Sequence, residues 1–542
     1  MLTVHHLVYY ALALLMAGTA TPARTTGPPA SPPPPSPSAS VPATGSPVVR
    51  LSSGRVRGLD QGAVRTFSGV RYAQPPVGRL RWAPPEAAKP WPGVADATKP
   101  GAACPQTPFP GVPPTDEDCL SVNVTMPRDT GGKRLPVLVW FHGGGFTSGA
   151  GSQYDAKRLA TQGRVIVVTV NYRLGVFGYF GHEGLAGSGT FAMADQIAAL
   201  RWTRHNAAAL GGDPRNVTVA GQSAGGMSTC ALLTSPAAAG LFDKAIISSG
   251  SCLIDWPDGG LFPTAPGHTP YASLATTRKD GAALATKLKC DKGSAEQTLD
   301  CLRARPAAEL LPHMQAFADH LTYGTPLLPV HPADALRKGT FHRVPVISGG
   351  TRDEMRSFIG GAIMAGQKFT PERYPELLKK AFGDQADAVA ARYPLSAYAS
   401  PALAWASVIT DRSWACPALE ADRLLARRNT VYAYEFGDRD APNVNGIEIP
   451  GFPLGATHAT DLPSLFDLGG RYALSTPPQQ RLGAQMVGYW TAFARTGDPN
   501  MQGAPRWSPF TARGPVLGLV PDAVKPVGYA ADHKCAFWKS IG

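Results

Sequence analysis

One serine in the sequence has the setting of a nucleophile. Ser223 is the centre of Gly221-Gln-Ser-Ala-Gly225, which follows the β-branched run 217–220 and precedes a helix-compatible stretch, 227–233. A strand that turns abruptly into a helix holds its central residue in a strained backbone conformation, and only small residues two positions away avoid a clash. The pattern predicts a nucleophile elbow with the Ser223 hydroxyl at the positive end of the helix.

A serine hydroxyl is a poor nucleophile and needs a base that is itself held by an acid. In folds with this kind of elbow the chain order is serine, acid, histidine. Of the twelve histidines, only His458 and His533 lie beyond any plausible acid. His533 stands beside Cys535 near the chain end, where a disulfide anchor is expected, whereas His458 lies in a loop-like stretch after the strand-like run 430–436. We therefore expect His458 to be the base.

Several carboxylates could be the acid. The apolar run 344–348 predicts a buried strand, and it leads into Gly349-Gly-Thr-Arg-Asp-Glu354. Carboxylates then lie at the carboxyl end of a strand, where α/β active sites are built. Both Asp353 and Glu354 qualify, and Asp438 or Asp440 after the later strand is a rival. Local chemistry does not separate Glu354 from Asp353.

A glycine-rich loop could supply the oxyanion hole. The apolar strand predicted at 137–141 ends in His142-Gly-Gly-Gly-Phe146. Glycines let backbone N–H groups approach a developing alkoxide closely, and the N–H of Ala224 would complete the set of donors. A phosphate-binding loop is the other use of such glycines, but no Gly-Lys-Ser/Thr follows here.

Composition limits the class of protein. The chain has 542 residues, 44% of them hydrophobic and 17% charged, which describes a globular protein with a large core. Away from the N-terminus no apolar run is long enough for a polytopic membrane protein. The net charge is +12, but the basic residues are scattered, whereas nucleic-acid binders cluster them on one face. We therefore expect no nucleic-acid partner.

The N-terminus is predicted to lie outside the fold. Residues 1–20 contain a short apolar stretch that ends in small residues, which predicts a secretory signal peptide, with an uncleaved membrane anchor as the alternative. Residues 21–47 are rich in Pro, Ser and Ala and predict a disordered linker. A single domain is expected at 48–542, in a secreted or cell-surface protein.

Eight cysteines fit an exported protein. None forms a Cys-x-x-Cys pair, so zinc-ribbon and thioredoxin-type sites are not indicated. Disulfides between sequence neighbours would close short loops, and one from Cys416 to Cys535 would hold the C-terminus, although sequence does not fix connectivity. Cys230 and Cys252 are left over and could be paired or free.

Further motifs carry a family resemblance. The chain contains Gly69-Val-Arg-Tyr-Ala-Gln-Pro-Pro-Val-Gly78, Glu117-Asp-Cys-Leu-Ser-Val-Asn123, Asn171-Tyr-Arg-Leu-Gly-Val-Phe-Gly178, Gly211-Gly-Asp-Pro214 and a final Cys535-Ala-Phe-Trp538. With the serine motif, these resemble the type-B carboxylesterases of the cholinesterase-like α/β-hydrolase family, over residues 48–538.

The resemblance implies an α/β-hydrolase fold with a large, mostly parallel sheet and helices on both faces. It also implies two-step ester hydrolysis through an acyl-enzyme, with no metal and no organic cofactor. The implied roles are nucleophile for Ser223, acid for Glu354, base for His458, and oxyanion donors for Gly144, Gly145 and Ala224. The implied disulfides are Cys104–Cys119, Cys290–Cys301 and Cys416–Cys535.

Departures from the family pattern bear on the substrate. Gln222 stands where family members commonly have Glu, and the segment 104–119 has no Trp to stack on a quaternary ammonium group. Choline esters are therefore not expected, and small to medium uncharged esters are. A lipase is the alternative, for which 360–367 is only weakly suggestive of a lid. A catalytically silent cell-surface binding protein is the third hypothesis, which the complete triad opposes.

Overall fold

The structure is a computed structural model that describes residues 46–109, 111–512 and 514–541. The predicted signal peptide at 1–20 and almost all of the predicted linker at 21–47 lie outside these described residues. Among the helices that the structure describes, none has the length and apolar character needed to cross a lipid bilayer.

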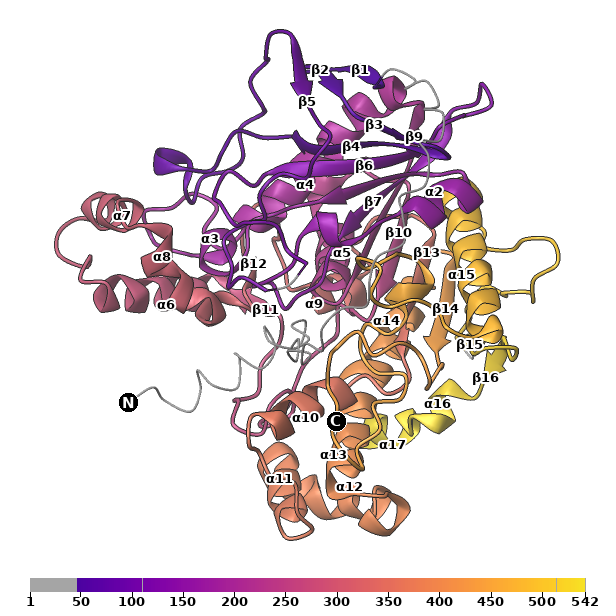
Figure 1. Cartoon of the computed structure of the whole chain (residues 1–542). Coiled ribbons are helices and arrows are strands. Elements are labelled where there is room, and N and C mark those ends of the chain that lie inside the picture. Colours follow the sequence, from indigo (N-terminus) through magenta and orange to yellow (C-terminus); the bar gives the residue numbers. More distant parts are fainter. Residues whose placement is uncertain (1–45, 110, 513, 542) are drawn as a thin grey trace, which may run out of the picture.

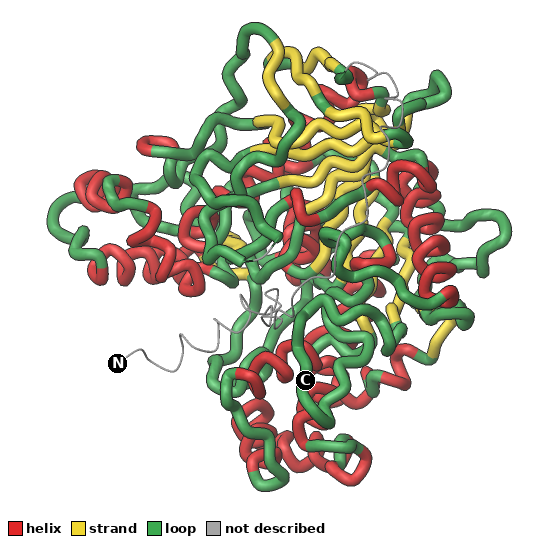
Figure 2. The backbone as a smooth tube through the Cα atoms, viewed as in Figure 1, coloured by secondary structure: helices red, strands yellow, loops and turns green. Residues whose placement is uncertain are grey.

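A large mixed sheet forms the centre of the described chain (Figures 1 and 2). Its eleven described strands follow the order β16-β15-β14-β13-β10-β9-β7-β8-β6-β4-β3. Neighbouring strands in this order are parallel from β15 through to β8. At the two edges, β16 pairs antiparallel with β15, and β6, β4 and β3 add antiparallel pairings beyond β8. The bounds are β3 Leu59–Gln61, β4 Val64–Arg71, β6 Ser121–Pro127, β7 Leu135–Phe141, β8 Ile166–Val170, β9 Gly212–Gln222, β10 Lys244–Ser248, β13 Val346–Thr351, β14 Val431–Phe436, β15 Val516–Leu519 and β16 Lys525–Val527.

Both faces of the sheet are buried, as strand β7 illustrates. Val137 and Val139 belong to one apolar core, and Leu138 and Trp140, which point the other way, belong to a second. The first core includes helices α4 (Phe191–Asn206), α5 (Ala224–Thr234) and α14 (Cys416–Leu425). The second includes α2 (Lys157–Gly163) and α15 (Pro477–Thr496), which lie side by side in Figure 1. The predicted α/β-hydrolase architecture is confirmed.

Smaller elements surround this core. Two further helical groups, α6–α8 and α10–α13, extend from the sheet in different directions in Figure 1. The small sheets are β1 Val48–Leu51 with β2 Gly54–Arg57 and β5 Val94–Asp96, and β11 Tyr271–Ser273 with β12 Leu321–Tyr323. The other helices are α3 Gly175–Tyr179, α6 Leu274–Lys287, α7 Ala295–Arg303, α8 Ala307–Leu310, α9 Pro332–Lys338, α10 Arg356–Met364, α11 Arg373–Phe382, α12 Ala386–Arg392, α13 Pro401–Ile409, the π-helical turn Thr410–Ala415, α16 Tyr529–Asp532 and α17 Cys535–Ser540.

The strand predicted at 344–348 is shifted. Strand β13 begins at Val346 and continues through two glycines to Thr351, because the parallel ladder with β14 extends that far. A Cβ atom on Gly349 would lie 2.3 Å from the ring of Tyr434 on β14. Glycine, which propensity disfavours in strands, is therefore required here by the neighbouring aromatic ring.

The structure forms four disulfides. Three are the pairs that the resemblance implied, Cys104–Cys119, Cys290–Cys301 and Cys416–Cys535. The fourth joins Cys230 on α5 to Cys252 in the loop after β10, and both of these side chains are buried. The two cysteines left open by the sequence are therefore placed as a pair.

The C-terminal segment is held by a buried charge cluster beside the Cys416–Cys535 disulfide. His533 Nδ1 lies 2.6 Å from Asp411 Oδ1, and its Nε2 lies 2.5 Å from Glu435 Oε1. Burial opposes the charged imidazolium, but the two carboxylates outweigh it and raise the pKa of His533 to about 9. The sequence indicated a disulfide anchor here, and His533 is a second attachment of the same segment.

This cluster predicts a stability change in alkaline solution. A group whose pKa is higher in the folded than in the unfolded protein stabilises the fold below its unfolded pKa and loses that contribution as pH rises through the folded pKa. The free energy of unfolding should therefore fall as pH rises from near 6.5 through about 9, the raised pKa of His533. Urea titrations of His533→Gln should show a flatter dependence, while the exposed control His205→Gln should follow the parent. Parallel curves for all three proteins would contradict the assignment.

Candidate active site

Ser223 occupies the turn between β9 and α5. Its backbone has φ 57° and ψ −125°, a conformation that non-glycine residues rarely adopt, and its N–H donates to the Ser248 carbonyl at 3.0 Å. The residue lines a cavity at the carboxyl ends of the parallel strands, directly before the first turn of α5. This is the strained strand–turn–helix that the sequence predicts.

The two glycines of the motif are required by close backbone packing. A Cβ atom on Gly221 would lie 2.3 Å from the Gly225 carbonyl oxygen. A Cβ atom on Gly225 would lie 2.0 Å from the carbonyl oxygen of Phe141, the last residue of β7. A larger residue at 221 would push α5 away from β9, and one at 225 would push it away from β7; either change would displace the serine.

His458 and Glu354 form a close, buried pair. His458 lies in the loop after β14, and its Nδ1 is 2.5 Å from Glu354 Oε2. The other carboxylate oxygen of Glu354 accepts the Thr351 N–H at 2.8 Å, which fixes the carboxylate at the end of β13. Glu354 is 2% exposed and His458 8% exposed. The structure therefore brings Glu354 to the predicted base.

The rival carboxylates face other partners. Asp353 is paired with Arg356 and Arg439, each at 2.9 Å. Asp438 accepts from the side chain of Gln479 at 3.0 Å. Asp440 lies exposed at the surface. The backbone turn after β13 thus sends adjacent carboxylates to different surroundings, a distinction that sequence alone does not reveal.

The far side of the imidazole is contacted by Gln222. The side-chain amide nitrogen of Gln222 lies 3.2 Å from His458 Nε2. With the Nδ1 proton directed at Glu354, Nε2 is the free acceptor, so the amide donates to it. The sequence marked Gln222 only as a departure from the family pattern; the structure shows that its side chain contacts the predicted base.

The glycine loop lies against the serine. A Cβ atom on Gly143 would lie 3.0 Å from the Ser223 Cβ, and Gly144 and Gly145 line the same cavity. Among the described residues, no acceptor is found for the N–H groups of Gly144, Gly145 and Ala224. These three donors thus remain available at the cavity.

His142 supports the glycine loop in its neutral form. Burial lowers the pKa of His142 to about 4, so the ring is uncharged at neutral pH. Its Nδ1 lies 2.7 Å from the Gly143 carbonyl oxygen, to which a protonated Nδ1 donates. The ring also stacks on Tyr172, whose hydroxyl donates to the His142 carbonyl at 2.7 Å.

The cavity wall is mostly apolar and comes from distant parts of the chain. Trp414, on the π-helical turn, and Phe358, on α10, both pack on the His458 ring, with centroid distances of 5.0 Å and 5.1 Å. Other apolar lining residues are Met227, Trp256, Leu261 and Phe262. No local motif marked these side chains, because loops and helices bring them together only in the fold.

One carboxylate, Asp319, interrupts this wall. His268 Nε2 lies 3.3 Å from Asp319 Oδ2. Burial opposes a charge on His268, but Asp319 outweighs this effect and raises the pKa of His268 above its ordinary value. His268 lies directly against the carboxylate of Asp319, so this carboxylate already has a partner within the protein. Neither residue lies in a motif that marks it in the sequence.

The sheet order, the elbow and the buried acid–histidine pair define an α/β-hydrolase. Comparison with profiles of protein families matches residues 45–538 to the family described as the carboxylesterase family. The chain belongs to the carboxylesterase family, whose members act on small-molecule esters, and it is a carboxylic ester hydrolase.

Similar proteins extend over most of the chain. Human cocaine esterase is 33% identical over 524 residues, covering 89% of this chain and 88% of the relative. Para-nitrobenzyl esterase of Bacillus subtilis (strain 168) is 34% identical over 495 residues, covering 85% and 92%. Mouse acylcarnitine hydrolase is 31% identical over 505 residues, covering 85% of each chain.

Proposed function

We propose that this enzyme hydrolyses esters through a serine acyl-enzyme, with Ser223, His458 and Glu354 as the catalytic triad. The observation that carries the proposal is the 2.5 Å contact between His458 Nδ1 and the buried Glu354, beside the strained turn of Ser223. A buried carboxylate on Nδ1 fixes the tautomer whose Nε2 accepts a proton. The same contact favours Glu354 over Asp353 as the acid.

The proposed first half-reaction forms the acyl-enzyme. Ser223 Oγ replaces the Gln222 amide at His458 Nε2, gives its proton to that nitrogen and attacks the ester carbonyl carbon. The carbonyl oxygen becomes an alkoxide, which the N–H groups of Gly144, Gly145 and Ala224 stabilise. The imidazolium then returns the proton to the leaving alcohol as the carbon–oxygen bond breaks.

The proposed second half-reaction releases the acid. A water molecule gives a proton to His458 Nε2 and attacks the acyl carbon, and the oxyanion donors act again. The proton returns to Ser223 Oγ as the acyl bond breaks. In both half-reactions Glu354 contacts the transient imidazolium at 2.5 Å and stabilises it.

We further propose small to medium uncharged esters as substrates. The apolar wall favours uncharged acyl and alcohol groups, and the carboxylate in it, Asp319, is already paired with His268. Burial opposes the first part of the suggested lid segment 360–367, since Gly360, Gly361 and Ala362 are packed inside the protein on α10, whereas Met364 is exposed. The arranged triad opposes a silent binding protein.

The proposal includes secretion, with a signal peptide at 1–20, a linker at 21–47 and one domain at 48–542. Four disulfides in the described residues support export, because disulfides persist in oxidising compartments. The first strand of the structure begins at Val48, which supports the proposed domain boundary.

The nucleophile can be tested directly. Ser223→Ala should lower kcat for p-nitrophenyl butyrate by roughly 10⁴-fold or more, because no group remains to form the acyl-enzyme. A fluorophosphonate should label the parent once, at Ser223, and leave the variant unlabelled in peptide mass spectrometry. Full activity in a folded Ser223→Ala protein would reject the mechanism.

The acid can be tested with a matched pair of isosteric substitutions. Glu354→Gln should lower kcat by about 10⁴-fold, because an amide no longer stabilises the imidazolium on Nδ1. Asp353→Asn keeps an oxygen to accept the Ala456 N–H and should lower kcat by less than about tenfold. The two variants should show the reverse order in thermal stability, since Asp353 joins two arginines. Equal losses of kcat would reject the assignment of Glu354.

The substrate class can be tested with esters matched in size. A neutral tert-butylethyl (3,3-dimethylbutyl) ester should be hydrolysed with a higher kcat/KM than the choline ester of the same acid, because the wall gives the cation no unpaired carboxylate. Activity should also fall for long acyl chains, without activation at a lipid–water interface. Preference for the choline ester, or interfacial activation, would contradict the proposed substrate class.

A further inference from the structure

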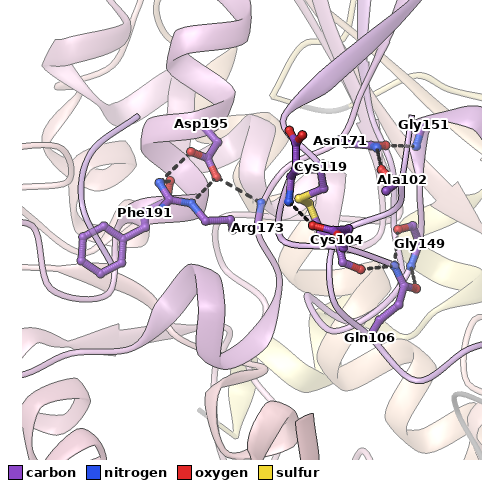
Figure 3. The surroundings of a disulfide bond; sticks show 12 residues. Ala102, Cys104, Gln106, Cys119, Gly149, Gly151, Asn171, Arg173, Phe191 and Asp195 are labelled. Atoms are coloured by element: carbon purple, nitrogen blue, oxygen red, sulfur yellow. Dashed lines mark hydrogen bonds and ion pairs between the residues drawn. A yellow bond between two sulfur atoms is a disulfide. The ribbon is translucent and has the colours of Figure 1, made fainter. Parts of the chain in front are cut away.

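The disulfide loop 104–119 reaches the glycine loop through one side chain. Gln106 is 0% exposed, and its amide nitrogen donates to the Gly149 carbonyl at 2.9 Å. The Gly149 N–H in turn donates to the Gln106 side-chain oxygen at 2.8 Å (Figure 3). One amide therefore satisfies both backbone groups of a single glycine. The same amide nitrogen also donates to the Cys104 carbonyl at 3.0 Å, which joins this contact to the disulfide.

A second amide makes a parallel link. Asn171 follows β8, and its side-chain oxygen accepts the Gly151 N–H at 2.8 Å. Its amide nitrogen donates to the carbonyl of Ala102 at 3.0 Å, next to the disulfide loop (Figure 3). The segment after the glycines is thus attached to the 102–106 region at two successive points.

Gly149 packs against the glycine loop, so its position affects where the proposed oxyanion donors lie. A Cβ atom on it would lie 2.4 Å from His142 Nδ1 and 2.7 Å from the Gly143 carbonyl oxygen, so its backbone packs directly on the start of the loop. Within the loop, the Ser148 N–H donates to the Gly144 carbonyl at 3.0 Å. A Cβ atom on Gly144 would lie 2.2 Å from the Ser148 carbonyl oxygen. The loop closes on itself, and a shift of Gly149 would shift Gly143 and Gly144.

We propose that Gln106, held by the Cys104–Cys119 disulfide loop, is a positioning residue for the oxyanion donors Gly144 and Gly145. This inference rests on the proposed serine mechanism. Oxyanion donors accelerate a reaction when they are fixed before the charge develops, and a displacement of about 1 Å costs on the order of 100-fold in rate. Gln106 acts through Gly149 and touches no reacting atom.

The arrangement requires an amide and not merely a polar residue. Gln106 presents one donor and one acceptor to the two backbone groups of Gly149, whereas an ionised glutamate presents only acceptors. In Gln106→Glu, a buried carboxylate oxygen would face the Gly149 carbonyl oxygen, and the two would repel each other. The variant keeps the size of the side chain while removing both hydrogen bonds that the amide nitrogen donates, to the carbonyls of Gly149 and Cys104.

A control with the same chemical change exists in another disulfide loop. Gln297 lies between Cys290 and Cys301, is exposed, and accepts the Ser294 N–H at 2.8 Å in the capping box of α7. Glutamate serves the same capping function. Gln297→Glu should therefore leave hydrolysis unchanged.

The experiment compares transition-state and ground-state binding in the full chain. An aliphatic trifluoromethyl ketone adds the serine and places an oxyanion in the hole, whereas the matched methyl ketone binds without substantial addition. For Gln106→Glu we expect kcat for p-nitrophenyl butyrate to fall about 10- to 100-fold with little change in KM. The Ki of the trifluoromethyl ketone should rise by a similar factor, and that of the methyl ketone should not change.

Different outcomes separate the inference from its premise. If Gln106→Glu is folded and both kcat and the trifluoromethyl ketone Ki stay within twofold of the parent, the positioning role is wrong. Equal weakening of both ketones would show general damage to the cavity and would also reject it. If the parent itself neither hydrolyses the ester nor adds to the trifluoromethyl ketone, the proposed mechanism has failed instead.

A second pair of variants covers the case in which Gln106→Glu does not fold. Removing the disulfide in Cys104→Ser/Cys119→Ser should weaken the trifluoromethyl ketone more than the methyl ketone, because the loop that carries Gln106 is released. The matched control Cys290→Ser/Cys301→Ser opens a disulfide far from the glycine loop in sequence and should keep the parent ratio. Identical ratios in the two double variants would overturn the proposal.

Discussion

The site depends on how closely α5 approaches the end of β7. The Gly225 backbone is packed so tightly on the Phe141 carbonyl that no side chain fits between them. This contact forces the sharp turn at Ser223 and brings its Cβ beside Gly143, the start of the glycine loop. The proposed nucleophile and the proposed oxyanion donors are thus held together by one backbone contact, which is possible only because residue 225 has no side chain.

The parallel sheet supplies the other half of the geometry. Strands β7, β9, β13 and β14 run in the same direction, so the segments after them meet at one edge. Glu354 and His458, which are 104 positions apart in the chain, come within 2.5 Å there. The wall around them is then built by segments outside the sheet, and Trp414 on the π-helical turn packs on the imidazole ring.

Sequence reasoning reaches the parts of this site that obey local rules. The elbow can be predicted from the sequence because the small residues and the change from strand to helix all fall within a dozen positions. Which of Asp353 and Glu354 contacts His458 cannot be predicted from the sequence, because adjacent side chains on a turn point to different partners. The contact of Gln222 with His458 and the pairing of Cys230 with Cys252 are equally hidden, since each depends on how distant segments pack.

The apolar cavity has a consequence for the release of products. An uncharged ester enters it without bringing a charge, but hydrolysis leaves a carboxylate in the same place. No Lys or Arg is found among the described residues that line the cavity, and the carboxylate there, Asp319, is itself negative. An anion held there can accept from the N–H groups of the glycine loop, but it meets no side-chain cation among these described lining residues to offset its lost hydration. The cavity is therefore better suited to the uncharged ester than to the acid formed from it, which favours departure of the acid after hydrolysis.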